Sequence, residues 1–378
     1  MNSARRVGRL ISNGIRYRRL KQSGMPYRLE ALSLEITHRC ICRCVMCNIW
    51  KIPAEAPDLE LRVWLNLLTS PELRSLRELD LTGGEPFLRN DLGELLHGIC
   101  SLQKTHFPAL RTLAITTNGI LTDRILERTV EIIGPLRDRG IDLVLACGMD
   151  AAGDLHDRIR NFPGAWQRLQ DTLSGLCGIR KTNSNLVLGI KTTVVPLNAR
   201  ELDRVADYAE EHDLFTIISP CIITPNRFGN SDRAPDLAFS PEERDTIIHF
   251  YESLRFAWSG HRKAVLDYLK SGRMKKPCTA GFNTLFIRYN GDVFPCPVIP
   301  SAVGTILERE LGDLYRSGRA CRFRKQVGNF PECAVCTEPG LERIARHLEG
   351  FSFLRLLPLL GAKEFSSLAR HMGIDKFL

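Results

Sequence analysis

The sequence predicts an α/β protein built on a parallel sheet, which is either open and doubly wound or closed into a barrel. Six short β-rich segments alternate with longer segments of helical character between residues 31 and 219. Such alternation is typical of parallel strands joined by right-handed helical crossovers. In both architectures the functional residues follow the carboxyl ends of the strands.

Each expected element is a separate hydrophobic segment of the chain. The expected strands are Ala31–Ile36, Glu78–Thr82, Thr112–Thr117, Asp142–Ala146, Leu186–Val195 and Leu214–Ser219. The expected helices lie near Leu59–Leu68, Leu92–Leu102, Asp123–Arg137, Pro163–Ile179 and Ala199–His212. Four motifs follow the first four strands: the cysteine run 40–47, TGGEPFLR (82–89), TTNG (116–119) and CGMD (147–150). Four successive strand ends therefore converge on one predicted mouth.

The composition is that of a globular protein without a membrane span. The chain has 378 residues, of which 44% are hydrophobic and 25% charged. It has no apolar run near the ~18 residues that a transmembrane helix needs. Its basic N-terminus is not followed by the apolar segment of a signal peptide, so we expect a cytoplasmic protein.

The net charge of +9 is concentrated in residues 1–30, a basic N-terminal arm. This arm contains eight Lys and Arg residues against Glu30 alone, which accounts for +7 of the total. The arm is expected to be a solvated helix or frayed extension, or else to contact nucleic acid or a membrane surface.

The cysteines are grouped in a way that favours metal binding. In a reducing compartment, clustered thiols more often hold metal than form disulfides. Cys40, Cys44 and Cys47 have the spacing C-x-x-x-C-x-x-C, so one loop can bind three irons of a four-iron cluster and leave the fourth open. We expect Cys42 to point away and to be the surplus thiol. The alternative is a zinc knuckle using Cys44 and Cys47, with His38 nearby.

The cysteine spacing followed by GGEP after the second strand resembles the radical S-adenosylmethionine (radical SAM) superfamily. The resemblance implies a partial (β/α)6 TIM-like barrel over residues 31–225, a [4Fe-4S] cluster with an open iron, and S-adenosyl-L-methionine bound to that iron. It implies reductive cleavage of this cofactor to a 5′-deoxyadenosyl radical, which abstracts a hydrogen atom from a substrate. A low-potential electron donor such as flavodoxin or ferredoxin would be a partner.

The same resemblance assigns cofactor-binding roles to individual residues. Gly83 and Gly84 would approach the methionine portion, with Glu85 nearby, and Met46 would pack on adenine. The remaining assignments are Asn118, in TTNG, and Arg160, in the stretch DAAGDLHDRIR (150–160). Gly148 stands where the family pattern has serine, so one hydroxyl contact to the cofactor is expected to be missing.

A second cysteine set lies in residues 276–340, after a helical connector (226–275) and before a C-terminal tail (341–378). Asn290-Gly291 predicts a two-residue hairpin turn that brings Cys278 and Cys296 together, and PECAVC adds Cys333 and Cys336. This region resembles the SPASM module in its shortened Twitch form, which implies a second [4Fe-4S] cluster. Zinc is the alternative, with Cys321 as a substitute ligand.

The sequence constrains the identity of the substrate and the type of radical reaction less than it constrains the fold and the cofactors. Only 30 residues precede the first expected strand, which shifts the expectation from a peptide toward a sugar-like or other small substrate. We expect a two-electron oxidation, and the enzyme would be an oxidoreductase. The alternatives are epimerisation with Cys221 or Cys147 as hydrogen donor, modification of nucleic acid, or a non-catalytic iron–sulfur carrier or sensor. The tail FSFLRLLPLLGAKEF (351–365) is expected to be a docking helix and leaves a lipid-linked substrate open.

Overall fold

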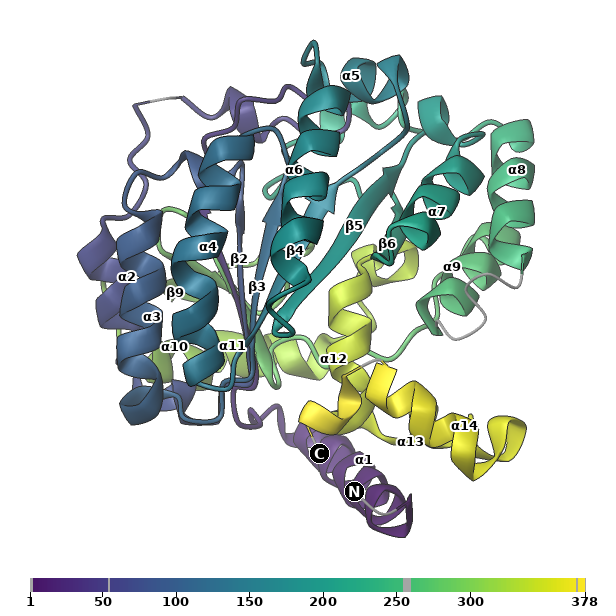
Figure 1. Ribbon diagram of the computed structural model, residues 1–378. Helices are drawn as coiled ribbons and strands as arrows, with labels where there is room; N and C mark the ends of the chain where they lie inside the picture. Colours follow the sequence, from purple (N-terminus) through teal and green to yellow (C-terminus); the bar gives the residue numbers. More distant parts are fainter. Residues whose placement is uncertain (1–2, 54, 254–259, 372, 378) are drawn as a thin grey trace.

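The computed structural model describes residues 3–53, 55–253, 260–371 and 373–377. Its centre is a curved sheet whose first six strands are parallel and lie in the order of the sequence (Figure 1). These strands are β1 (Ala31–Thr37), β2 (Glu78–Gly83), β3 (Thr112–Thr117), β4 (Asp142–Gly148), β5 (Leu186–Val194) and β6 (Phe215–Pro220). The parallel (β/α)6 core and the C-terminal cysteine-rich module are both confirmed.

Helices cover the outer face of this sheet. They are α2 (Leu61–Leu67), α3 (Leu92–His106), α4 (Thr122–Asp138), α6 (Ala165–Arg180) and α7 (Leu202–Glu211), while the short α5 (Asp154–Arg160) lies at the mouth beside the cysteine loop. The strand register explains the packing, because it aligns one row of leucines across five strands: Leu32, Leu79, Leu113, Leu143 and Leu186. The next row, one residue further on, is smaller or more polar: Ser33, Asp80, Ala114, Val144 and Val187. Since successive strand residues face opposite sides, the second row lines a hollow interior.

The C-terminal module extends the same sheet. β7 (Thr284–Ile287) pairs in parallel with β1, and β8 (Asp292–Phe294) and β9 (Gly304–Thr305) follow in antiparallel order. The hairpin between β7 and β8 is as predicted, but its loop is not a two-residue turn. Arg288 N donates to Asp292 O at 3.0 Å, which leaves a three-residue loop, 289–291, and Gly291 has a φ of +89°. A glycine in the left-handed region at the end of a three-residue loop is a common hairpin geometry.

The remaining helices connect the barrel to the module and to the chain ends. They are α1 (Ser3–Ser23), α8 (Pro241–Glu252), α9 (Gly260–Ser271), α10 (Leu311–Arg316), α11 (Gly318–Gln326), α12 (Pro339–Glu349), α13 (Phe351–Leu354) and α14 (Leu357–His371). Short 3-10 turns occur at Ile49–Lys51, Pro71–Ser75, Pro86–Leu88, Pro196–Asn198, Ser231–Arg233, Pro331–Val335 and Ile374–Lys376. None of the helices described in the structure is long and apolar enough to cross a bilayer.

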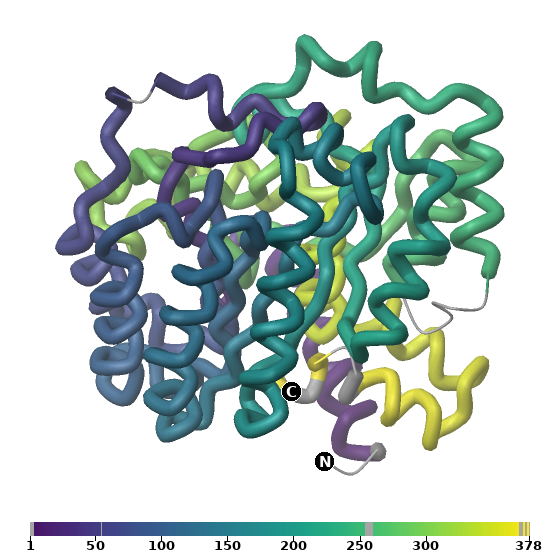
Figure 2. The backbone as a smooth tube through the Cα atoms, turned by 45° about the horizontal axis from the view of Figure 1, so that its top comes forward, coloured from purple at the N-terminus to yellow at the C-terminus, as the bar shows by residue number. Residues whose placement is uncertain are grey.

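The basic N-terminal arm forms α1, and one side of this helix is packed rather than frayed. Leu10 is fully buried against α13 and α14, and Tyr17 is buried against the module. The Arg6 guanidinium donates to Ser366 Oγ at 2.7 Å. Figure 2 shows α1 beside the C-terminal helices, at the end of the barrel opposite the mouth. Part of the basic arm is therefore a structural element of the C-terminal half.

Candidate active site

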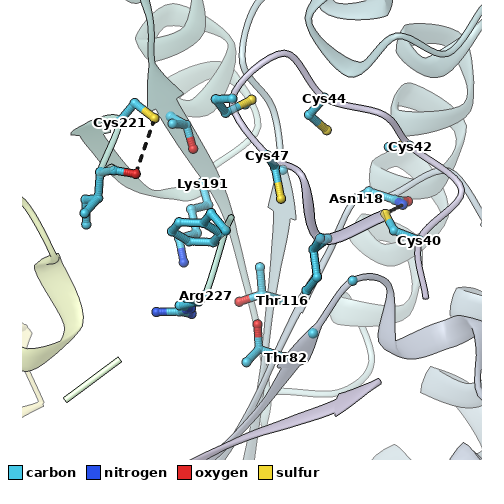
Figure 3. A pocket seen from close by; sticks show the side chains of 18 of the residues that line it. Cys40, Cys42, Cys44, Cys47, Thr82, Thr116, Asn118, Lys191, Cys221 and Arg227 are labelled. Atoms are coloured by element: carbon cyan, nitrogen blue, oxygen red, sulfur yellow. Dashed lines mark hydrogen bonds between the residues drawn. The ribbon is translucent and has the colours of Figure 1, made fainter. Parts of the chain in front are cut away.

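All four cysteines of the first run, the three predicted ligands and Cys42, line a cavity of about 190 Å³ at the carboxyl ends of the strands. Cys40, Cys44 and Cys47 lie on the loop that follows β1, and Figure 3 shows their sulfur atoms around one space. Gly83, Gly84, Asn118, Gly148 and Arg160 line the same cavity. The predicted convergence of the first four strand ends is therefore observed.

The cysteine loop is held by hydrogen bonds from three parts of the chain. Glu85 N donates to Arg39 O at 2.8 Å, Val45 N donates to Ile159 O at 2.9 Å, and Asn230 Nδ2 donates to Met46 O at 2.9 Å. The loop therefore depends on β2, on α5 and on the segment after β6. These contacts fix the thiols in place before any ligand binds.

Gly83 and Gly84 are required by the approach of β2 to the cysteine loop. A Cβ atom on Gly83 would lie 2.2 Å from Thr37 O, and one on Gly84 would lie 2.2 Å from Arg39 O. Gly83 also has a φ of +150°, which disfavours other residues. Both glycines line the cavity, so their predicted contact with a cofactor is geometrically accessible.

Glu85 has a different place from the predicted one. It does not line the cavity; it is fully buried behind it. Its carboxylate accepts hydrogen bonds from Asn118 N at 2.7 Å, Thr117 Oγ1 at 2.9 Å and Phe87 N at 3.1 Å. Burial raises its pKa to about 7, against the lowering effect of these donors. Glu85 is therefore a positioning residue that joins the ends of β2 and β3.

We expect Glu85→Ala to lower the free energy of unfolding by about 3 kcal/mol, because three buried donors lose their acceptor. Denaturant unfolding followed by circular dichroism measures this loss. Glu85→Gln is the matched control, since its amide oxygen can still accept, and we expect a smaller loss. Equal stabilities of the alanine variant and the parent would contradict the positioning role.

Arg160 occupies the space left by the missing serine side chain. A Cβ atom on Gly148 would lie 2.2 Å from Arg160 Nη2, and the same nitrogen is 2.9 Å from Asp150 Oδ2. Arg160 Nη1 is 3.9 Å from Cys44 Sγ, and Arg160 Nε is buried with no hydrogen-bond partner among the described residues. The guanidinium therefore lies beside the thiols with a donor to spare, which supports the predicted cofactor contact.

The thiols of the loop differ in proton affinity. The Cys42 thiol donates to Cys44, and this bond together with the Arg160 charge lowers the pKa of Cys44 to about 7, although burial acts in the opposite direction. Burial raises the pKa of Cys47 to about 12.

Cys42 does not point away as predicted. It is almost fully buried beside Cys40 and Cys44 and packs on Ile120 and Ala165.

The two proposed hydrogen donors lie in different environments. Cys221 lines the cavity across from the cysteine loop (Figure 3), and Asn230 Nδ2 is 3.9 Å from its sulfur. Cys147 does not line the cavity. It is fully buried in the hydrophobic core, where desolvation raises its pKa to about 12. The structure therefore contradicts the placement of Cys147, because its strand register turns it toward the core.

Met46 is buried at the cavity wall, as its predicted packing role requires.

A second cavity of about 580 Å³ fills the barrel interior. It adjoins the first cavity, and both are lined by Thr82, Thr116, Lys191, Ile217, Arg227, Glu338 and Pro339. Arg227 Nη1 lies 3.7 Å from Glu338 Oε2, and Ser33 Oγ donates to Oδ2 of the half-buried Asp80 at 2.5 Å. Sequence reasoning missed Lys191 and Arg227. The signal available for Lys191 was a lysine inside an otherwise apolar expected strand.

The second cysteine set also converges. Cys278, Cys296, Cys333 and Cys336 lie in one cluster with Tyr17, and Tyr17 Oη donates to Cys278 O at 2.6 Å. Burial, together with the neighbouring Cys336 and Cys333, raises the pKa of Cys278 to about 11. Cys321 is not in this cluster; its thiol lies against Ser23 O at the end of α1. The four predicted ligands are therefore together, and the substitute is apart.

Both cysteine sets fit the groups that the sequence predicted. The first set offers three thiols, one with a lowered pKa, beside glycines that no side chain could replace and an arginine with a free donor. Thiolates are the usual ligands of iron–sulfur clusters. The second set offers four thiols in a mostly apolar surrounding. Four thiols can fill all four iron corners of a cluster and leave no open ligand position.

Comparison with known proteins gives two family matches on this chain. Residues 34–209 match the model of the radical SAM superfamily, and residues 278–337 match the SPASM iron–sulfur cluster-binding domain. The AdoMet-dependent heme synthase of Methanosarcina barkeri is 25% identical over 334 residues, 81% of this chain and 87% of that protein. The PqqA peptide cyclase of Methylocella silvestris is 27% identical over 326 residues, 81% of this chain and 79% of that protein.

Solved structures show the same fold. SuiB of Streptococcus suis bound to S-adenosylmethionine has a TM-score of 0.57 and 13% identity, covering 85% of this chain and 75% of that chain. Native anSMEcpe with bound AdoMet has a TM-score of 0.56 and 14% identity, covering 92% of this chain and 99% of that chain. At such identities the likeness concerns the fold alone.

Proposed function

The chain belongs to the radical SAM superfamily and carries a C-terminal SPASM module, and from this we propose that it oxidises a substrate held in the barrel by two electrons. The family implies a [4Fe-4S] cluster, S-adenosyl-L-methionine and a further iron–sulfur cluster. When bound, these groups supply the electron that splits the sulfonium into methionine and a 5′-deoxyadenosyl radical, and an acceptor for the electron left on the substrate. The first electron comes from an external low-potential donor of the flavodoxin or ferredoxin kind.

The residues around the first cavity hold and orient the cofactor. Cys40, Cys44 and Cys47 are the ligands, and the backbone at Gly83 and Gly84 leaves room for the methionine portion. Arg160 offers its free Nε donor to a carboxylate or ribose oxygen. This arrangement supplies position and excludes water, which is the protein's usual share in cofactor chemistry.

The observation that carries the proposal is that the cofactor cavity adjoins the barrel interior. Seven residues line both cavities, so a substrate bound in the interior has direct access to the space beside the cysteines. Charged and hydroxyl side chains gather at this junction: Lys191, Arg227, Thr82 and Thr116 (Figure 3). We propose that they orient the substrate carbon that loses hydrogen.

The interior supports a small substrate or a short segment of a larger one. Its volume of about 580 Å³ lies in the range of small-molecule pockets. Relatives are named for heme synthesis, maturation of a killing factor and cyclisation of a peptide. We therefore propose two substrate classes: a sugar-like or other small molecule, or a side chain of a peptide.

The position of residues 221–222 supports oxidation through the module. Cys221 lines the cofactor cavity, and the next residue, Ile222, packs in the cluster that contains the four module cysteines. Cys221 and Ile222 are adjacent, so the cofactor cavity and the module cysteines lie near each other at this point of the chain. This proximity favours transfer of the second electron from the substrate to the module. Cys221 also keeps epimerisation as the second candidate, because its thiol faces the cavity where a substrate radical would form.

We expect the anaerobically reconstituted protein to form 5′-deoxyadenosine with reductant, and its substrate to lose two electrons without gaining solvent hydrogen. Mass spectrometry of the product made in deuterated water decides this point. Deuterium at carbon, lost in Cys221→Ala, would instead establish epimerisation. Cys147→Ala is the control, since Cys147 faces the core and its removal does not affect labelling. Absence of 5′-deoxyadenosine would contradict the proposed function altogether.

A further inference from the structure

Two segments at the end of the barrel opposite the cysteine loop expose large aliphatic and basic side chains, and Figures 1 and 2 show where these segments lie. They are the outer face of α1 and residues 355–364, and together we call them the amphipathic lobe. Ile11 is 41% exposed and Ile15 45% exposed, and Leu359 is 78% exposed. Large aliphatic side chains exposed together need a reason.

On α1 the exposed isoleucines lie between arginines. Ile11 and Ile15 are four residues apart and so share one stripe of the helix. Exposed arginines flank this stripe: Arg18 lies along one edge and Arg19 along the other, and Arg5, Arg9 and Arg16 are exposed further round the helix. Because the opposite stripe, with Leu10 and Tyr17, is buried in the protein, the orientation of this amphipathic face is fixed.

The second part of the lobe repeats this pattern. Leu359 and Leu360 are exposed at the start of α14, between the exposed Arg355 and Lys363. Phe353 and Phe365 anchor this segment on Leu10 of α1. The two apolar patches therefore belong to one packed unit rather than to independent chain ends.

We propose that the amphipathic lobe docks on the surface of a bilayer that contains anionic lipids. The isoleucine and leucine side chains enter the acyl boundary, and the arginines bind the anionic headgroups, which is how interfacial helices bind. Residues 1–30 carry +7 of the chain's net +9, so the charge is complementary to such a surface. A second copy of the chain would bring like charges together, and nucleic acid would leave the aliphatic side chains exposed.

This docking leaves the radical site free. The cysteine loop and its cavity lie at the other end of the strands, so cofactor, electron donor and substrate still have access to the mouth (Figure 1). The inference is therefore independent of the proposed reaction. In this inference the lobe places the protein at a membrane surface and takes no part in the radical reaction.

Co-sedimentation of the reconstituted full chain with vesicles tests the proposal. We expect binding to vesicles of phosphatidylcholine with phosphatidylglycerol, little binding to phosphatidylcholine alone, and a loss of binding as salt is raised. Arg9→Gln and Arg19→Gln should each weaken binding about fivefold. Ile11→Asp with Ile15→Asp, and Leu359→Asp with Leu360→Asp, should each abolish it.

Matched controls and separate readouts keep the test decisive. Val130→Asp replaces a residue of α4 that is 61% exposed and lies outside the lobe, and it should leave vesicle binding unchanged. All variants should retain 5′-deoxyadenosine formation, which excludes misfolding. The proposal is overturned if binding ignores lipid charge, if the aspartate variants bind as well as the parent, or if light scattering shows that they disrupt a dimer instead. Preference for RNA over anionic vesicles would overturn it as well.

Discussion

Replacing Cys40, Cys44 or Cys47 with alanine should reduce 5′-deoxyadenosine formation to background. The three thiols line the cavity beside Gly83 and Gly84, and in the proposed function each would bind one corner of a four-iron cluster. Because a second open corner changes the coordination of the cofactor and weakens the cluster, the loss should be complete and not graded. Anaerobic assays by liquid chromatography, with iron content measured in parallel, give this result directly.

Cys42→Ala is the matched control in the same loop. Cys42 lies in the middle of the same loop, but its side chain is buried between Cys40 and Cys44 and packs on Ile120 and Ala165. We expect most of the cofactor cleavage to remain, with a modest loss of stability from the removed sulfur. Loss of the cluster in this variant, with activity kept in the Cys40 variant, would show that the ligand triplet is a different one.

Replacing Cys296 or Cys336 with alanine should separate cofactor cleavage from product formation. We expect the parent chain to hold about eight irons, as two four-iron clusters, and these variants to hold about four. 5′-Deoxyadenosine should still form, because the first cysteine loop is intact. The two-electron product should be lost, because the substrate radical has no acceptor.

Cys321→Ala serves as the control for this experiment. Its thiol contacts the end of α1 and lies outside the four-cysteine cluster, so iron content and product should not change. One zinc with about four irons in the parent chain would contradict the assignment of a second iron–sulfur cluster. Product formation at the parent rate in the Cys296 variant would contradict its role as electron acceptor.

The sequence predicted those features that rest on local pattern. The six parallel strands appear within one or two residues of the expected bounds at most ends, because each is a short apolar segment bordered by polar residues. The cysteine loop was found by its spacing, and the glycine pair was found by the family resemblance that GGEP carries. Their chemistry requires fixed residue types at fixed intervals, and such requirements are visible in one dimension.

The errors arose where the direction of a side chain decides its role. Glu85 follows β2 and Cys147 lies near the end of β4, yet Glu85 turns to three buried hydrogen-bond donors and Cys147 turns into the core. The hairpin loop closes with three residues although its Asn-Gly pair predicted two. In each case a neighbour distant in the sequence sets the geometry, and spacing does not carry that information.

Periodicity and ligand spacing encode the sheet, the two thiol sets and the family resemblance, so these could be predicted before folding was considered. Three-dimensional packing was needed to show that Arg160 fills the space beside Gly148, that Lys191 and Arg227 lie where two cavities meet, and that the basic arm packs on the C-terminal helices. These juxtapositions join residues up to several hundred positions apart. They depend on how the strands are ordered and registered, and the chain fixes that order only when the whole core is packed.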